Sequence, residues 1–221
     1  MSWEQVSIAF VLLSVFLTVA TLCTLYDVSN DASNAYKAAY AAGYDDGKAS
    51  MQAVGDKQGK MYPPLLLQED PQWASEPYGD GTIGSHGCGL VCASIIISSH
   101  EGELVDPAYL AKEQSGSFIT CGINDPDKIC RWVEQVYGLE WSGEQWGFES
   151  VRSLLEEGWL VIAGVSGAFG TRTYGGHLVT LYGYGDDGCY VRDPDDGANS
   201  VRKFSWQELE QVSWGSINGL R

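Results

Sequence analysis

The chain has little positive charge, with 13 lysines and arginines against 29 aspartates and glutamates in 221 residues. The formal net charge of −16 argues against a nucleic-acid-binding protein, because phosphates are bound by lysine and arginine. No two cysteines have the C-x-x-C spacing of a structural zinc site, so we expect no metal. No glycine-rich phosphate loop with a lysine follows a strand, so neither a nucleotide nor another cofactor is expected. The acidic residues are expected to form a solvated surface around an ample apolar core.

The N-terminus also lacks basic residues, since the first lysine or arginine is Lys37. Residues 6–26 carry no charged side chain, and about 20 apolar residues span a bilayer as a helix. A signal peptide would have a basic start and a small-x-small cleavage site, and neither is present. We therefore expect residues 1–26 to be an uncleaved single-pass membrane anchor, with the C-terminal part exported. Secretion after signal cleavage is the alternative.

Residues 27–60 are rich in Ala, Gly, Asp and Lys and are interpreted as a partly helical stalk or linker. Tyr36, Tyr40 and Tyr44 would share one helical face, which could pack against the domain or another stalk, or simply be exposed. The sequence Met61-Tyr-Pro-Pro marks a boundary, so residues 61–221 are expected to form the globular domain.

Local signals within this domain predict helices in its first half and strands in its second. Asp-Pro pairs, helix-ending glycines and apolar runs place the helices at residues 88–100, 107–114, 126–137 and 150–157. A continuous apolar run predicts a buried strand at residues 159–165, and the turn Gly185-Asp-Asp-Gly predicts a hairpin of residues 177–184 and 188–193. This order predicts an α+β domain, with a helical N-terminal half packed on an antiparallel sheet.

Cys88 lies between two glycines at the predicted start of a buried helix, in the stretch Gly84-Ser-His-Gly-Cys-Gly-Leu-Val-Cys. The free N–H groups and the positive dipole end of a first helical turn favour a thiolate, which is the nucleophilic form of cysteine. The glycines lack a Cβ, so substrate and backbone can approach the sulfur closely. Cys88 is therefore the candidate nucleophile.

The predicted hairpin brings a histidine and a carboxylate together. If the turn is centred on residues 186–187, two residues face each other across the hairpin when their numbers sum to about 373. The numbers of His177 and Asp193 sum to 370, so these two residues are predicted to lie near opposite positions. Cross-strand Cβ atoms lie roughly 5 Å apart, within reach of an imidazole–carboxylate hydrogen bond. Asp193 would orient His177 toward the thiol, which is the arrangement of a nucleophile, a base and an orienting group.

Five segments in order resemble the papain-like cysteine peptidases, and most of all the bacterial branch related to bacteriocin-leader (double-glycine) processing peptidases. They are Leu67-Gln-Glu-Asp-Pro-Gln-Trp73, Tyr78-Gly79, residues 83–89, Gly176-His-Leu-Val-Thr-Leu-Tyr-Gly183 and Val191-Arg-Asp-Pro194. The resemblance implies the papain-like fold, with Cys88 as nucleophile, His177 as base and Asp193 as orienting group. It also implies that Gln68 donates to the oxyanion together with the Cys88 amide.

The predicted function is hydrolysis of peptide bonds through an acyl-thioester by a membrane-anchored, exported cysteine peptidase. The partners would be a peptide or protein substrate and the membrane. Amidase or transpeptidase activity of the same triad is an alternative, because the acceptor decides the product. A second alternative is an inactive module of the same scaffold that binds peptide or cell-wall material. In an exported protein Cys121 and Cys130 could form a disulfide.

Overall fold

The computed structural model describes residues 63–114 and 117–221. The predicted anchor of residues 1–26 and the predicted stalk of residues 27–60 lie outside the described residues, so both stay predictions. Within the described ranges, no helix is both long enough and apolar enough to cross a bilayer.

The first half of the described chain is mostly helical, as predicted. Its helices are α2 (Ile83–His86), α3 (Cys88–Glu101), α4 (Pro107–Gln114) and α5 (Pro126–Tyr137). Two short antiparallel pairs accompany them, namely β1 (Pro77–Tyr78) with β2 (Gly81–Thr82), and β3 (Ile119–Thr120) with β4 (Ile123–Asn124).

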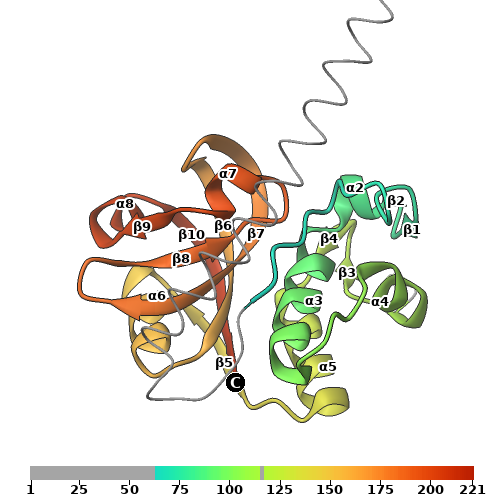
Figure 1. Ribbon diagram of the computed structural model, residues 1–221, viewed down its shortest axis with the longest axis horizontal. Coiled ribbons are helices and arrows are strands. Elements are labelled where there is room, and N and C mark those ends of the chain that lie inside the picture. The colour runs from blue at the N-terminus through green and yellow to red at the C-terminus, as the bar shows by residue number, and fades with distance from the viewer. Residues whose placement is uncertain (1–62, 115–116) are drawn as a thin grey trace, which may run out of the picture. The chain divides into compact units, whose positions relative to one another are not determined.

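The second half forms a six-stranded antiparallel sheet in the order β5-β10-β6-β7-β8-β9 (Figure 1). Its strands are β5 (Trp141–Trp146), β6 (Leu160–Phe169), β7 (Arg172–Gly185), β8 (Gly188–Arg192), β9 (Lys203–Ser205) and β10 (Ser213–Leu220). The helices among them are α6 (Phe148–Glu156), α7 (Gly197–Ser200) and α8 (Trp206–Glu210). The α+β architecture is therefore confirmed.

The helix boundaries follow local capping chemistry. Asp125 caps α5 by accepting a hydrogen bond from the backbone N–H of Lys128, and Pro126 occupies the first helical position. The predicted helix of residues 150–157 begins two residues earlier, at Phe148, because Gly147 takes a positive φ of 85° at which the chain turns into α6.

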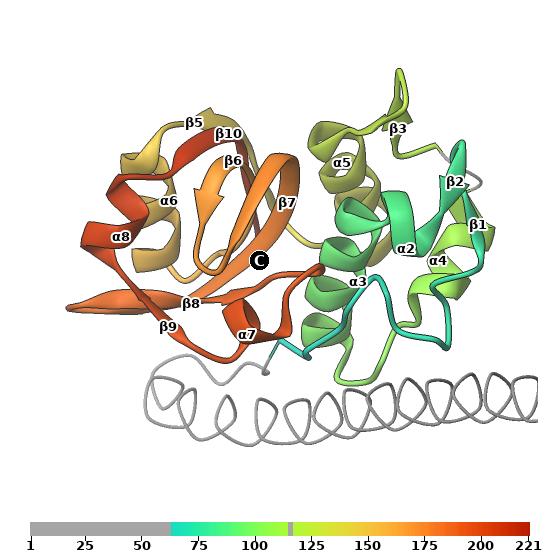
Figure 2. The same ribbon diagram turned by 90° about the horizontal axis from the view of Figure 1, so that it is seen from above.

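The sheet separates two hydrophobic clusters. Side chains alternate along β6, so that Ile162 joins Ile95 of α3 in one cluster while Val161 joins Leu155 of α6 in the other. Figure 2 shows α3 on one side of the sheet and α6 and α8 on the other. Helix α3 is consequently buried along most of its length and is held firmly against β7.

The prediction that Cys121 and Cys130 could form a disulfide is wrong, because both cysteines are free thiols. The α5 helix turns Cys130 into the core beside Ile129 and Val133, whereas Cys121 is exposed in the turn between β3 and β4. Burial also raises the pKa of Cys130 well above its usual value, so its reactive thiolate is disfavoured.

Candidate active site

Cys88 is the first residue of α3 and is half-buried, with Gly87 at the N-cap. A Cβ at position 87 would lie 2.4 Å from the Ile83 carbonyl oxygen, and one at position 89 would lie 2.8 Å from Asn124 Oδ1. The flanking glycines are therefore required for close packing of neighbouring segments around the thiol. The sequence predicted that the glycines let backbone and substrate come close to the sulfur; the Ile83 carbonyl at Gly87 is such an approach of backbone, and the approach of substrate stays a prediction.

The β7–β8 hairpin holds His177 and Asp193 together, with His177 Nε2 2.8 Å from Asp193 Oδ1. The last hydrogen-bonded pair of the hairpin matches Thr180 with Arg192. Continuing this register places Asp193 opposite Val179, so Asp193 and His177 are diagonal neighbours on one face of the hairpin. The predicted hairpin is confirmed, and the ion pair follows from its register.

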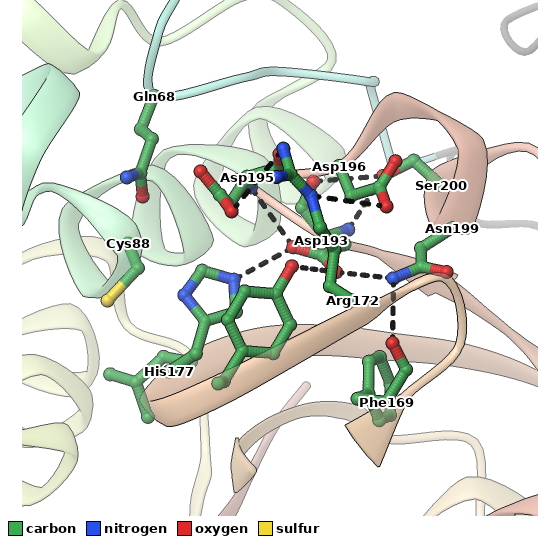
Figure 3. Close-up of polar contacts among 12 residues, drawn as sticks. Gln68, Cys88, Phe169, Arg172, His177, Asp193, Asp195, Asp196, Asn199 and Ser200 are labelled. Carbon is green, nitrogen blue, oxygen red and sulfur yellow. Dashed lines mark hydrogen bonds and ion pairs between the residues drawn. The ribbon is translucent and has the colours of Figure 1, made fainter. Parts of the chain in front are cut away.

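The Asp193 carboxylate is completely buried and is surrounded by donors. Besides His177, it accepts hydrogen bonds from the Tyr174 hydroxyl and Asn199 Nδ2, both at 2.9 Å, and from the backbone N–H of Asp195 at 3.0 Å (Figure 3). Burial by itself would raise the pKa of Asp193, but the hydrogen bond and charge of His177, with the hydrogen bonds from Asn199 and the Asp195 backbone, lower it. The carboxylate therefore stays ionised inside the protein.

The second nitrogen of the His177 ring, Nδ1, lies on the side of Cys88 (Figure 3). Burial alone would lower the pKa of His177, but hydrogen bonds with Asp193 and Cys88 raise it to about 9. The imidazole is therefore protonated at neutral pH, with its Nδ1 side facing Cys88.

Gln68 lies beside Cys88 on the segment that precedes the helices (Figure 3). Its backbone N–H donates to the Pro194 carbonyl at 2.7 Å, so this segment is tied to the residue that follows Asp193. The Gln68 side chain is buried and donates from Nε2 to the Gly84 carbonyl at 2.9 Å. A primary amide has two N–H bonds, so one remains unused, and Gln68 Oε1 is buried without a hydrogen-bond partner among the described residues.

A pocket of about 450 Å³ opens in front of the thiol and the imidazole. The β3–β4 hairpin forms one wall, with Ile123 and Asn124, and β6 and β10 form another, with Val165 and Trp214. Cys88 and His177 both line it, whereas Gln68 does not. An extended peptide could enter here with a carbonyl group next to the sulfur.

Three polar residues of the site were missed from the sequence. Tyr174 stacks on His177, with ring centroids 4.2 Å apart. Residues three apart on a regular strand point to opposite faces, and the pairing of β6 with β7 shifts register between His177 and Tyr174, so the alternation of side chains did not indicate this contact. Asn199 reaches Asp193 from the short helix α7, and Asn124 reaches Cys88 from the short strand β4. No local pattern marks either residue.

An α+β fold that sets a helix-terminal cysteine against a histidine–aspartate pair defines the papain-like class of cysteine peptidases, the class that the sequence resembles. The chain matches the model of the Peptidase_C39 like family over residues 64–220 and belongs to that family. The resemblance to this branch of the papain-like peptidases is thereby confirmed. No curated protein gives a significant match.

Solved structures of similar fold include two peptidases associated with transporters. One is a double glycine motif protease from an AMS/PCAT transporter in complex with the leader peptide, with 15% identity, a TM-score of 0.48, and 74% of this chain and 94% of that chain covered. The other is the peptidase domain of Streptococcus ComA, a bi-functional ABC transporter, with 18% identity, a TM-score of 0.48, and 72% and 98% covered.

Proposed function

We propose that this protein is a cysteine peptidase in which Cys88, His177 and Asp193 act as the catalytic triad. In the first half-reaction, Cys88 Sγ attacks the carbonyl carbon of a peptide bond and forms a carbon–sulfur bond. His177 Nδ1 then gives its proton to the departing amine as the carbon–nitrogen bond breaks, which leaves an acyl-thioester. Asp193 holds the ring in the orientation that this transfer requires.

In the second half-reaction, water attacks the thioester carbonyl while His177 Nδ1 takes its proton. The carbon–sulfur bond breaks, the acid leaves, and the thiolate–imidazolium pair returns. The Cys88 backbone N–H and the free N–H of Gln68 stabilise the oxyanion in both steps. If an amine replaces water, the same thioester yields a transpeptidation product.

The observation that carries this proposal is the short bond between His177 and the buried Asp193, with Cys88 at the helix terminus on the other side of the ring. The test is digestion of a peptide library by the full-length chain, read by mass spectrometry. We expect cleavage by the wild type and by a variant of a buried cysteine, Cys189→Ala, and none by Cys88→Ala. Equal product patterns from the wild type and Cys88→Ala would overturn the proposal and favour a binding module.

We also propose that residues 1–26 anchor the protein in the membrane with the peptidase domain outside the cytoplasm. Support comes from the uncharged stretch of residues 6–26. Cys121 is exposed and Cys88 lines the pocket, so a membrane-impermeant maleimide should label both on intact bacterial cells, and the double variant Cys121→Ser with Cys88→Ala should abolish this signal. Labelling only after lysis would contradict the orientation, and a mature mass lacking the first residues would indicate signal cleavage.

A further inference from the structure

The side chain of Asn124, at the end of β4, reaches the first turn of α3. Its Nδ2 lies 2.6 Å from the His86 carbonyl oxygen and 3.5 Å from Cys88 Sγ. A sulfur acceptor is large, so 3.5 Å from nitrogen to sulfur is a hydrogen-bonding distance. Asn124 therefore offers an N–H to the atom that we propose to be the nucleophile.

The orientation of this amide is unambiguous because of its other partners. The His86 carbonyl can only accept, so the NH₂ group of Asn124 must face it. The Tyr78 hydroxyl donates to Asn124 Oδ1 at 2.9 Å. Burial raises the pKa of Tyr78 far above its usual value, so the phenol keeps its proton and remains a donor.

The backbone around Asn124 is also held in place. The N–H of Asp125 donates to the Phe118 carbonyl at 2.8 Å, and the Thr120 hydroxyl donates to the Asp125 carboxylate at 2.6 Å. On the other side, Gly89 permits close contact, since a Cβ there would lie 2.9 Å from the Asn124 Cβ. The amide thus meets the sulfur without freedom to rotate away.

We propose that Asn124 is a further catalytic residue, which stabilises the Cys88 thiolate by donating an N–H to it, and that Tyr78 is a positioning residue that acts through Asn124. This inference rests on the proposed function, because it assigns a role in the same site. It predicts that thiolate formation depends on Asn124 even when no substrate is present.

The test is the pH dependence of alkylation of Cys88 by iodoacetamide in the full-length chain, with each cysteine followed by peptide mass spectrometry. Hydrogen bonds to charged groups contribute about 1.5–3 kcal/mol in proteins, and we place this long N–H···S bond below that range. Asn124→Ala should therefore slow alkylation at pH 6.5 by about three- to tenfold, leave the alkaline plateau unchanged, and move the midpoint upward.

Two further variants and one control sharpen this test. Asn124→Asp keeps the shape but replaces the donor with a carboxylate, so it should slow alkylation more than Asn124→Ala does. Tyr78→Phe should have a smaller effect in the same direction, because the amide loses only its orienting partner. Asn218→Ala, which removes a buried amide bonded to Trp141 outside the pocket, should leave the profile unchanged.

The inference is wrong if folded Asn124→Ala, checked by its melting temperature, alkylates with the wild-type pH profile. This outcome is distinguishable from failure of the proposed function. If the wild type cleaves no peptide but Asn124→Ala still shifts the profile, the peptidase proposal fails and the stabilisation of the thiolate stands. If peptides are cleaved and the profile does not move, only the role of Asn124 is lost.

Discussion

The protonation of His177 sets the pH range in which the proposed mechanism can operate. Its pKa is raised to about 9, so the imidazolium that protonates the leaving amine is present at neutral pH and is lost as the pH rises through that value. We expect kcat/KM to fall on the alkaline side near pH 9, measured with any peptide that the wild type cleaves. If kcat/KM instead fell only several pH units higher, a group other than His177 would control protonation of the leaving amine.

The variant Asp193→Asn tests whether Asp193 is what raises the pKa of His177. The hydrogen bond and charge of Asp193 raise the pKa of His177, so their loss should move the alkaline limb to lower pH. The neutral amide oxygen is also a weaker acceptor, and the new NH₂ group would face the donors Tyr174 and Asn199, so the ring is held less well and we expect kcat to fall by about 10²-fold. A variant with lower activity but an unmoved limb would mean that Asp193 only supports the fold.

Tyr174 combines a stacked ring above His177 with a hydroxyl that donates to Asp193. Tyr174→Phe keeps the stacking and loses the hydrogen bond, so kcat should fall by about two- to threefold. Tyr174→Leu loses both and should lower kcat by about tenfold. Tyr174 does not line the pocket, so KM should stay constant in both variants. Equal losses in the two variants would exclude a role for the stacked ring.

At the scale of elements, the first turn of α3 and the β3–β4 hairpin depend on each other at Gly89. Gly89→Ala would place its Cβ 2.8 Å from Asn124 and Ile129, and such overpacking costs about 1–3 kcal/mol of unfolding free energy. Gly197→Ala is the matched control, because Gly197 also lies in the first turn of a helix and its Cβ would meet nothing closer than 3.8 Å. Urea denaturation should show destabilisation only at position 89, and equal stability of the two variants would contradict this packing.

The elements that the sequence predicted well are those specified by adjacent residues. The Asp-Pro pairs at Asp106 and Asp125 begin α4 and α5 as expected, because capping involves only the next few residues. The short strands β1 to β4 were not predicted, since two-residue strands carry no periodic pattern. This omission concealed Asn124, which β4 brings to the thiol.

At the scale of the whole molecule, Arg192 connects segments that are far apart in the sequence. Its buried guanidinium donates from Nε to the Pro63 carbonyl at 2.9 Å and from Nη1 to the Ser200 carbonyl, and it lies over the Tyr182 ring. The chain before Gln68 and the end of β8 are therefore tied together next to the site.

Arg192→Lys should lower the unfolding free energy by about 2–4 kcal/mol in urea, because an ammonium cannot reproduce the planar fork and would leave buried carbonyls unpaired. Arg202→Lys, at an exposed pair with Glu208, should change it by less than about 0.5 kcal/mol. Similar values for the two variants would show that the guanidinium does not hold these segments.

The sequence alone determined the helix that begins at Cys88, the hairpin, and hence the proximity of His177 to Asp193, because these features depend on backbone geometry over a few residues and one tight turn. Only the tertiary structure decided that the hairpin meets the start of α3, that Asn124 and Tyr174 join the site, and that Gln68 bonds Gly84. The physical reason is that distant segments approach one another through the packing of the whole core, which no local pattern encodes.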